Sequence, residues 1–96
     1  MAKKSIIQDK RCCWVCGTHT DLHKHHIYFG IKNRKISDQN GFVVWLCYNH
    51  HNGGKQGVHF NPVLDKNLKQ VCQQEFESQG HTREEFIQLI GRNYLE

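Results

Sequence analysis

The sequence predicts a small α+β domain held together by zinc, and three observations point to that class. Two half-sites with metal-ligand spacing, Cys13–Cys16 and Cys47–His50, stand about thirty residues apart. Two strand-like runs rich in β-branched and aromatic residues occupy positions 23–29 and 41–47. Residues 61–91 carry two helical patterns. A chain of 96 residues has a thin core, so a structural metal would contribute much of its stability.

The length fits a single domain over residues 1–96, which we divide into three stretches. Residues 1–11 form a basic N-terminal arm, with Ile6 and Ile7 as its anchors on the body. Residues 12–60 hold all but one of the cysteines and all but one of the histidines, and form the zinc knuckle and metal-binding core. Residues 61–96 form a helical packing region.

The helical region shows start and stop signals for two helices. Asn61 is placed as an N-cap with Pro62 at the first helical position, and apolar residues recur at helical spacing up to Gly80. Thr82 and Glu85 form a capping box before a second apolar face that ends at Gly91. Both helices are expected to serve packing rather than chemistry.

Composition indicates a protein of the cytoplasm with a polyanionic partner. The formal charge is +4 and the isoelectric point is about 8.9. We find no apolar stretch long enough for a signal peptide or a membrane span. In a reducing compartment, five cysteines indicate metal ligands or buried thiols rather than disulfides.

The two half-sites together predict a structural Zn²⁺ site. "CWVCG" places two thiolates on one turn, and "LCYNH" supplies a second pair at the same spacing. We assign the four ligands as Cys13, Cys16, Cys47 and His50. The alternatives are that Cys12 replaces Cys13, or that these are buried thiols beside a surface histidine. Cys72 lies on an apolar helical face and is expected in the core.

The remaining histidines predict a second metal centre. "HKHHIYF" and "GFVVWLC" are expected to pair as strands, joined by the basic polar segment 30–40 as a contact loop. A short helix after Cys47 would carry His50 and His51 toward different sides. His51 would then face the strand histidines His25 and His26, and the imidazoles would hold a divalent ion with open positions.

The pattern C-x-x-C-G, then H-H-I, then L-C-x-x-H-H resembles the HNH endonucleases, whose fold is a treble-clef or ββα-metal unit. The segment "GKQGVHF" and the helix after it resemble, more narrowly, phage HNH proteins of the recombination-enhancing, RecA-dependent nuclease type. The resemblance covers roughly residues 11–79. It implies a metal-dependent hydrolase acting on DNA phosphodiester bonds, with Mg²⁺, Mn²⁺, Ni²⁺ or Zn²⁺ as the catalytic ion.

The resemblance also implies roles for individual residues. His25 and His51 take the places of metal ligands, and His26 takes the place of the general base that accepts a proton from the attacking water. The family's middle asparagine falls at Phe42 in this chain. Asn40 is the nearest replacement, and His59 is the alternative as a further ligand.

The choice of histidines for the second metal centre stays open in two respects. Because adjacent residues of a regular strand face opposite ways, His25 and His26 can share a site only if the strand ends or bulges there. His23 and His25 share a face, and form a rival metal pair. His59 is otherwise an ordinary, partly exposed histidine.

DNA contact would come from basic side chains that neutralise phosphates. Lys3, Lys4, Lys10 and Arg11 belong to the N-terminal arm. Those expected around the histidines are Lys24, Lys32, Arg34, Lys35 and Lys55.

A nuclease is the first interpretation, and two others remain. One is a zinc-finger module that binds nucleic acid without catalysis, and the other is a small phage protein that binds a host partner. A homodimer, or a partner protein in recombination or packaging, fits the nuclease interpretation as well.

Overall fold

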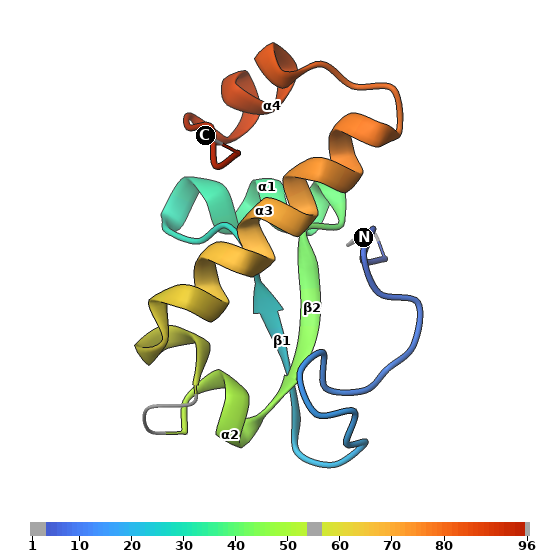
Figure 1. The fold of residues 1–96 in the computed structure, drawn as a ribbon, viewed down its shortest axis with the longest axis vertical. Coiled ribbons are helices and arrows are strands. Elements are labelled where there is room, and N and C mark those ends of the chain that lie inside the picture. Colours follow the sequence, from blue (N-terminus) through green and yellow to red (C-terminus); the bar gives the residue numbers. More distant parts are fainter. Residues whose placement is uncertain (1–3, 54–56, 96) are drawn as a thin grey trace.

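Two short antiparallel strands form the centre of the protein in its computed structural model (Figure 1). Strand β1 spans Leu22–His26 and strand β2 spans Val43–Cys47. Their register places Lys24 opposite Trp45 and His25 opposite Val44. The structure describes residues 4–53 and 57–95. The predicted α+β class, with paired strands followed by helices, is confirmed.

The connection between the strands differs from the predicted loop. Residues Ile31–Asn40 form a helix, α1, and the strands are shorter than the runs of residues 23–29 and 41–47. The prediction failed because α1 buries only Ser37 and therefore lacks an apolar stripe. Its one clear sequence signal is Gly41, which adopts a left-handed conformation with φ 76° and closes the helix with an N–H bond to Ser37.

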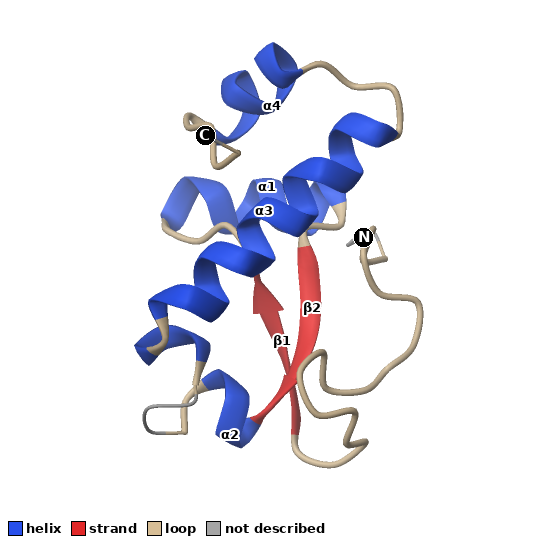
Figure 2. Ribbon diagram, viewed as in Figure 1, coloured by secondary structure: helices blue, strands red, loops and turns tan. Residues whose placement is uncertain are grey.

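The longest of the helices after β2 is α3, and Figure 2 shows it crossing in front of α1 at the end of the sheet where β1 ends and β2 begins, with α4 beyond it. As predicted, α3 begins at Pro62 with the Asn61 side chain as its N-cap, and α4 begins with the capping box of Thr82 and Glu85. The elements in chain order are α2 (Tyr48–His51), the 3₁₀ turn η2 (Val58–Phe60), α3 (Pro62–Ser78) and α4 (Arg83–Ile90).

An aromatic core joins these helices to the end of the sheet. The Phe42 ring contacts Tyr28 edge-on at a centroid distance of 5.4 Å and Phe76 at 5.5 Å. Phe86 of α4 packs on Tyr28 at 5.2 Å. Cys72 is also buried there, as predicted, and burial raises the pKa of its thiol to about 12. The core therefore fixes the point where β1 ends and β2 begins.

The described part of the N-terminal arm packs along β2. The Ile6 N–H donates to the Gly41 carbonyl at 2.9 Å, and Ile6 and Ile7 pack against the core, as predicted. The Gln8 side chain accepts a bond from the Trp45 N–H at 2.8 Å and donates to the Cys12 carbonyl at 2.6 Å. Within residues 4–53 and 57–95, no helix has the length and hydropathy needed to cross a membrane.

Candidate metal centres

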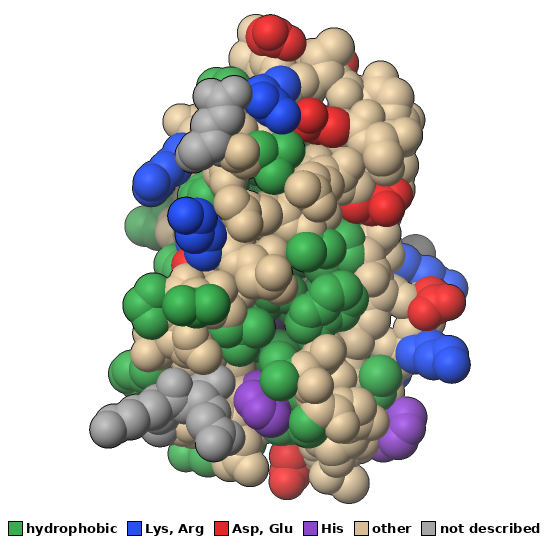
Figure 3. All heavy atoms as spheres, in the orientation of Figure 1, with side chains coloured by type: hydrophobic (Ala, Val, Ile, Leu, Met, Phe, Trp, Pro, Cys, Tyr) green, Lys and Arg blue, Asp and Glu red, His purple; other side chains and the backbone are tan. Residues whose placement is uncertain are grey.

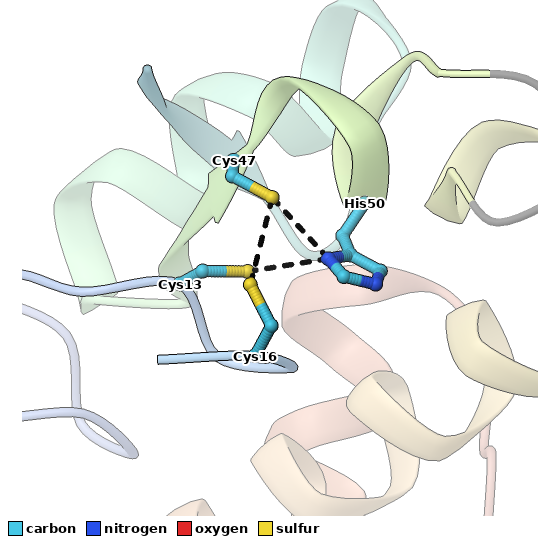
Figure 4. A group of neighbouring side chains, drawn as sticks. All are labelled: Cys13, Cys16, Cys47 and His50. Carbon is cyan, nitrogen blue, oxygen red and sulfur yellow. Dashed lines mark hydrogen bonds between the residues drawn. The ribbon is translucent and has the colours of Figure 1, made fainter. Parts of the chain in front are cut away.

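Four side chains from two distant segments converge beside the C-terminal end of β2 (Figure 4). Cys13 and Cys16 come from the N-terminal loop, Cys47 is the last residue of β2, and His50 lies one turn later on α2. Their candidate ligand atoms all lie within 4.8 Å of one another. These are the four residues that the sequence predicts as zinc ligands.

The spacing of these atoms fits a tetrahedral zinc ion. The Sγ atoms of Cys16 and Cys47 are 3.8 Å apart, and the His50 Nδ1 lies 3.2 Å from the Cys47 Sγ and 3.7 Å from the Cys13 Sγ. Tetrahedral Zn²⁺ with bonds of about 2.3 Å to sulfur and about 2.0 Å to nitrogen gives S–S and S–N separations of about 3.8 and about 3.5 Å. This Cys₃His cluster can hold a metal ion such as zinc.

Cys13 is prepared to act as a thiolate ligand. Burial raises the pKa of its thiol, but backbone N–H groups of Cys47, Cys16 and Val15 outweigh burial and bring the pKa down to about 6. Burial raises the pKa of the Cys47 thiol. Cys12 stays outside the cluster as a half-buried free thiol. Cys13, and not the alternative Cys12, is therefore the first candidate ligand.

A second cluster consists of His25 on β1, His51 on α2 and His59 on η2. One ring nitrogen from each lies within 4.8 Å of the other two. The Nε2 atoms of His51 and His59 are 3.2 Å apart, close to the value of about 3.3 Å that two imidazoles on one tetrahedral zinc would show. The structure therefore brings together all three histidines that the sequence predicts as ligands of a catalytic ion.

His25 shows why a cation fits this cluster. Its side chain is buried, and its Nε2 atom has no hydrogen-bond partner among the residues that the structure describes. Burial lowers its pKa to about 3, with a further contribution from the neighbouring His51 and His59. Burial and the nearby histidines likewise lower the pKa of His51 to about 4. Both rings are thus neutral at physiological pH, which is the state in which imidazole binds metals.

His26 lies beside this cluster but on the other face of the strand. It is the last residue of β1, so the strand ends where the sequence requires it to end. Its Nε2 atom lies 3.0 Å from the Oδ1 atom of Asp38 on α1, and the Lys24 Nζ is 3.0 Å from the same oxygen. The hydrogen bond from Lys24 is the main cause that lowers the pKa of Asp38 below its usual 3.8. Asp38 is therefore a charged acceptor for the His26 N–H.

A hollow of about 330 Å³ is lined both by the cluster of three histidines and by His26, the partner of Asp38. His25, His51 and His59 form one side of its lining, and His26 and Arg34 contribute to the rest. An ion held by the three histidines would thus share this hollow with His26.

The predicted catalytic residue Asn40 is not part of this hollow. Its side-chain amide donates to the Ile36 carbonyl at 2.9 Å, inside the last turn of α1. Phe42, which occupies the asparagine position of the pattern, is fully buried in the aromatic core. The prediction for Asn40 assumed a loop, whereas the helix directs this side chain to its own backbone. His59 is the residue that the structure places beside His25 and His51.

The predicted phosphate-binding residues are distributed unequally. Lys24 and Arg34 line the hollow, whereas Lys32 and Lys35 are exposed on α1 and do not line it. Lys55 lies outside the described residues, as does Lys3 of the arm. Among the described residues, the basic side chains that line the hollow are therefore one from strand β1 and one from helix α1.

The sequence analysis did not foresee how two residues near the histidines, Asp38 and His23, contact them. Asp38 was treated as part of a loop, and only the helix shows that it faces His26. His23 was considered as a rival ligand, but its Nδ1 lies 3.0 Å from the Nδ1 of His51, on the side of that ring away from His59. The i, i+2 spacing of His23 and His25 was the available signal for this shared face.

Comparison with protein-family models, with curated proteins and with solved structures finds no match to this chain.

Proposed function

We propose that the protein is a metal-dependent endonuclease of the HNH type, which hydrolyses phosphodiester bonds in DNA. The observation that carries the proposal is the hollow where three converging histidines face a fourth, His26, that is oriented by a carboxylate. A Cys₃His site beside the same short helix stabilises this arrangement.

In this proposal, His25, His51 and His59 would hold the catalytic ion. Bound there, a divalent ion supplies Lewis acidity that stabilises the charge developing on the phosphate and on the leaving oxygen. The unpartnered Nε2 of buried His25 supports this role, because a buried nitrogen without a partner is costly unless a ligand occupies it.

His26 would accept the proton of the attacking water. Because ionised Asp38 can only accept hydrogen bonds, the Nε2 atom of His26 must carry the proton that the two share. A neutral imidazole then has its lone pair on Nδ1, which is free to take a proton. Asp38 thus selects the tautomer and orientation that a general base needs, and Arg34 on the wall of the hollow would hold a phosphate oxygen.

The test is the nicking of supercoiled plasmid by the purified protein with added Mg²⁺, Mn²⁺, Ni²⁺ or Zn²⁺. We expect open-circular product with at least one ion, and His26→Ala should cleave about 10²- to 10⁴-fold more slowly. Its zinc content and DNA affinity should stay near normal, because a general base acts on water and not on ground-state contacts. His81→Ala removes an exposed histidine at the far end of the molecule and should cleave like the unmodified protein.

Two outcomes would contradict the proposal. If His26→Ala cleaved DNA at the wild-type rate while His23→Ala lost cleavage, the general base would have been assigned to the wrong histidine. Absence of cleavage with every ion, in protein that holds metal at both clusters, would leave a metal-stabilised binding module instead.

A further inference from the structure

A groove on the other side of Lys24 has no role in the function proposed above. Its volume is about 460 Å³, larger than that of the histidine hollow. The N-terminal arm forms one wall, and β2 contributes Val43 and Trp45 to the other. Figure 3 shows Lys and Arg side chains, with an acidic one between them, at the edge of the molecule over the arm.

The chemistry of the groove is an apolar floor with a cationic rim. Val43, Val44 and Trp45 supply the floor, and the Arg11 guanidinium carbon lies 4.5 Å from the centre of the Trp45 ring. The basic residues of the lining outnumber the single acidic one, Asp9, and they are Lys4, Lys10, Arg11 and Lys24. Phosphates match such a rim, and a planar base matches a surface formed by an indole and a guanidinium.

The walls of the groove are held in place by hydrogen bonds between side chains of the arm and backbone N–H groups. The Ser5 hydroxyl accepts bonds from the N–H groups of Ile7 and Gln8, at 3.2 and 3.1 Å. The Gln8 side chain connects the arm to the Trp45 N–H of β2. The groove therefore exists before a ligand binds, which reduces the entropy lost on binding.

The groove adjoins the candidate active site at Lys24. Lys24 lines both spaces, and it lies directly opposite Trp45 across the strand pair. Lys24 and His26 are two residues apart on β1 and so share one face of the sheet. A nucleic-acid strand with its phosphate beside His26 can thus continue past Lys24 toward Trp45.

We propose that this groove binds an unpaired segment of the DNA strand that the protein cleaves, with a base against Arg11 and Trp45 and phosphates at the rim. The inference rests on the proposed nuclease function and names its substrate class, DNA with a single-stranded region next to the cleaved bond. An unpaired base is required, because the bases of a duplex are stacked and paired and cannot reach an apolar floor.

The experiment measures binding through the fluorescence of Trp45, without added catalytic ion. Trp14→Phe leaves Trp45 as the only tryptophan, and all comparisons use this background. Titration with oligothymidylate should quench the emission, and a duplex of equal length should bind about tenfold more weakly or worse. Lys10→Ala with Arg11→Ala should weaken oligothymidylate binding about ten- to hundredfold, because it removes both a rim cation and the guanidinium that contacts the base, and it should flatten the salt dependence by about 0.7 units for the phosphate contact of Lys10.

The matched control is Lys66→Ala with Arg92→Ala. It removes the same charges from another hollow, where Arg92 likewise lies over an aromatic ring, Tyr94, at 5.2 Å. This variant should bind oligothymidylate as well as the background protein does. Zinc content and circular dichroism verify that both double variants are folded. The preference of the Trp14→Phe protein for single strands over duplex tests the proposal without either double variant.

The outcomes separate this inference from the nuclease function. Equal quenching by duplex and single strand, or equal loss in both double variants, would overturn the groove assignment even if plasmid nicking succeeds. Selective loss in the Lys10 and Arg11 variant would support the groove even if no ion gives cleavage, and only the nuclease function would then fail.

Discussion

At the scale of single residues, the two histidine roles depend on which side of β1 each ring faces. His25 points into the buried side, where His51 and His59 meet it, and His26 points to the side that carries Lys24. Adjacent residues thus serve one hollow from opposite faces because the strand ends at His26. This geometry leads to different phenotypes for neighbouring substitutions.

Substitution of a ligand should affect metal binding first. His25→Ala, His51→Ala and His59→Ala are each expected to weaken binding of the second metal by at least about tenfold, because each removes one of three imidazoles. Calorimetric titration of Mn²⁺ or Zn²⁺ into protein that retains its structural zinc would measure this, and a higher metal concentration should partly restore cleavage. Unchanged affinity in all three variants would exclude this cluster as a metal site.

Asp38→Asn tests the orientation of His26. The amide cannot replace the charged acceptor, so the maximal cleavage rate should fall about 10- to 100-fold while metal affinity stays the same. Steady-state kinetics with an oligonucleotide substrate separate this effect, on kcat, from one on KM. The control is Asp65→Asn, which removes a carboxylate that pairs with Lys69 on α3. Equal rates for Asp38→Asn and unmodified protein would show that Asp38 does not position the base.

At the scale of elements, α1 determines which of its cations reaches the site. Arg34 lines the histidine hollow, whereas Lys32 and Lys35 face solvent. The helix also supplies Asp38, so one element carries both the carboxylate beside His26 and the arginine that we propose as a phosphate ligand. A loop of the same sequence would not fix these two side chains relative to β1.

The cations of α1 should therefore contribute unequally. Replacing Lys32, Arg34 and Lys35 together by alanine should flatten the salt dependence of DNA binding by up to about three units, for all sequences alike. Arg34→Ala alone should lower the cleavage rate, and Lys32→Ala with Lys35→Ala should change binding only. Filter binding at several salt concentrations would measure the slope, and an unaltered slope in the triple variant would place the DNA elsewhere.

Helix α4 offers a test of stability that is independent of the site. Thr82→Ala removes the side chain that accepts the Glu85 N–H at 3.1 Å, and should lower the free energy of unfolding by about 1 kcal/mol. The Thr82 N–H, in turn, lowers the pKa of the Glu85 carboxyl below its usual 4.5. That stabilisation is complete above pH 4.5 and is lost as acid protonates the group.

Urea denaturation at pH 7 would measure the change. Thr20→Ala, an exposed loop threonine that caps no helix, should alter stability by less than about 0.5 kcal/mol. A Thr82→Ala variant as stable as the unmodified protein would show that the cap adds nothing to global stability.

At the scale of the whole molecule, zinc should decide whether the chain folds. The Cys₃His cluster connects the N-terminal loop to β2 and α2, which also carry His51 toward the second cluster. Cys16→Ser or removal of the ion with a strong chelator should therefore unfold the domain, as shown by circular dichroism. Cys12→Ser is the matched control and should retain one structural zinc per chain. A melting curve that does not change after verified zinc removal would contradict the four-ligand assignment.

The sequence alone determined the features that depend on local spacing. The cluster of Cys13, Cys16, Cys47 and His50, which can hold a metal ion such as zinc, follows from two half-sites, because a metal needs its donors on tight turns. The caps at Asn61 and Thr82 follow from side-chain chemistry within one helical turn. The convergence of His25 with His51 was also within reach, since strand alternation and a short helix specify which way each ring faces.

Only the tertiary structure decided the features that join distant segments without a periodic signal. Helix α1 has almost no buried face, so nothing in its pattern distinguished it from a loop, and Asn40 was misplaced while Asp38 was overlooked. The groove likewise depends on the arm packing beside Trp45 through Gln8 and Ile6. Such contacts arise from the packing of one segment on another, and local spacing along the chain does not specify them.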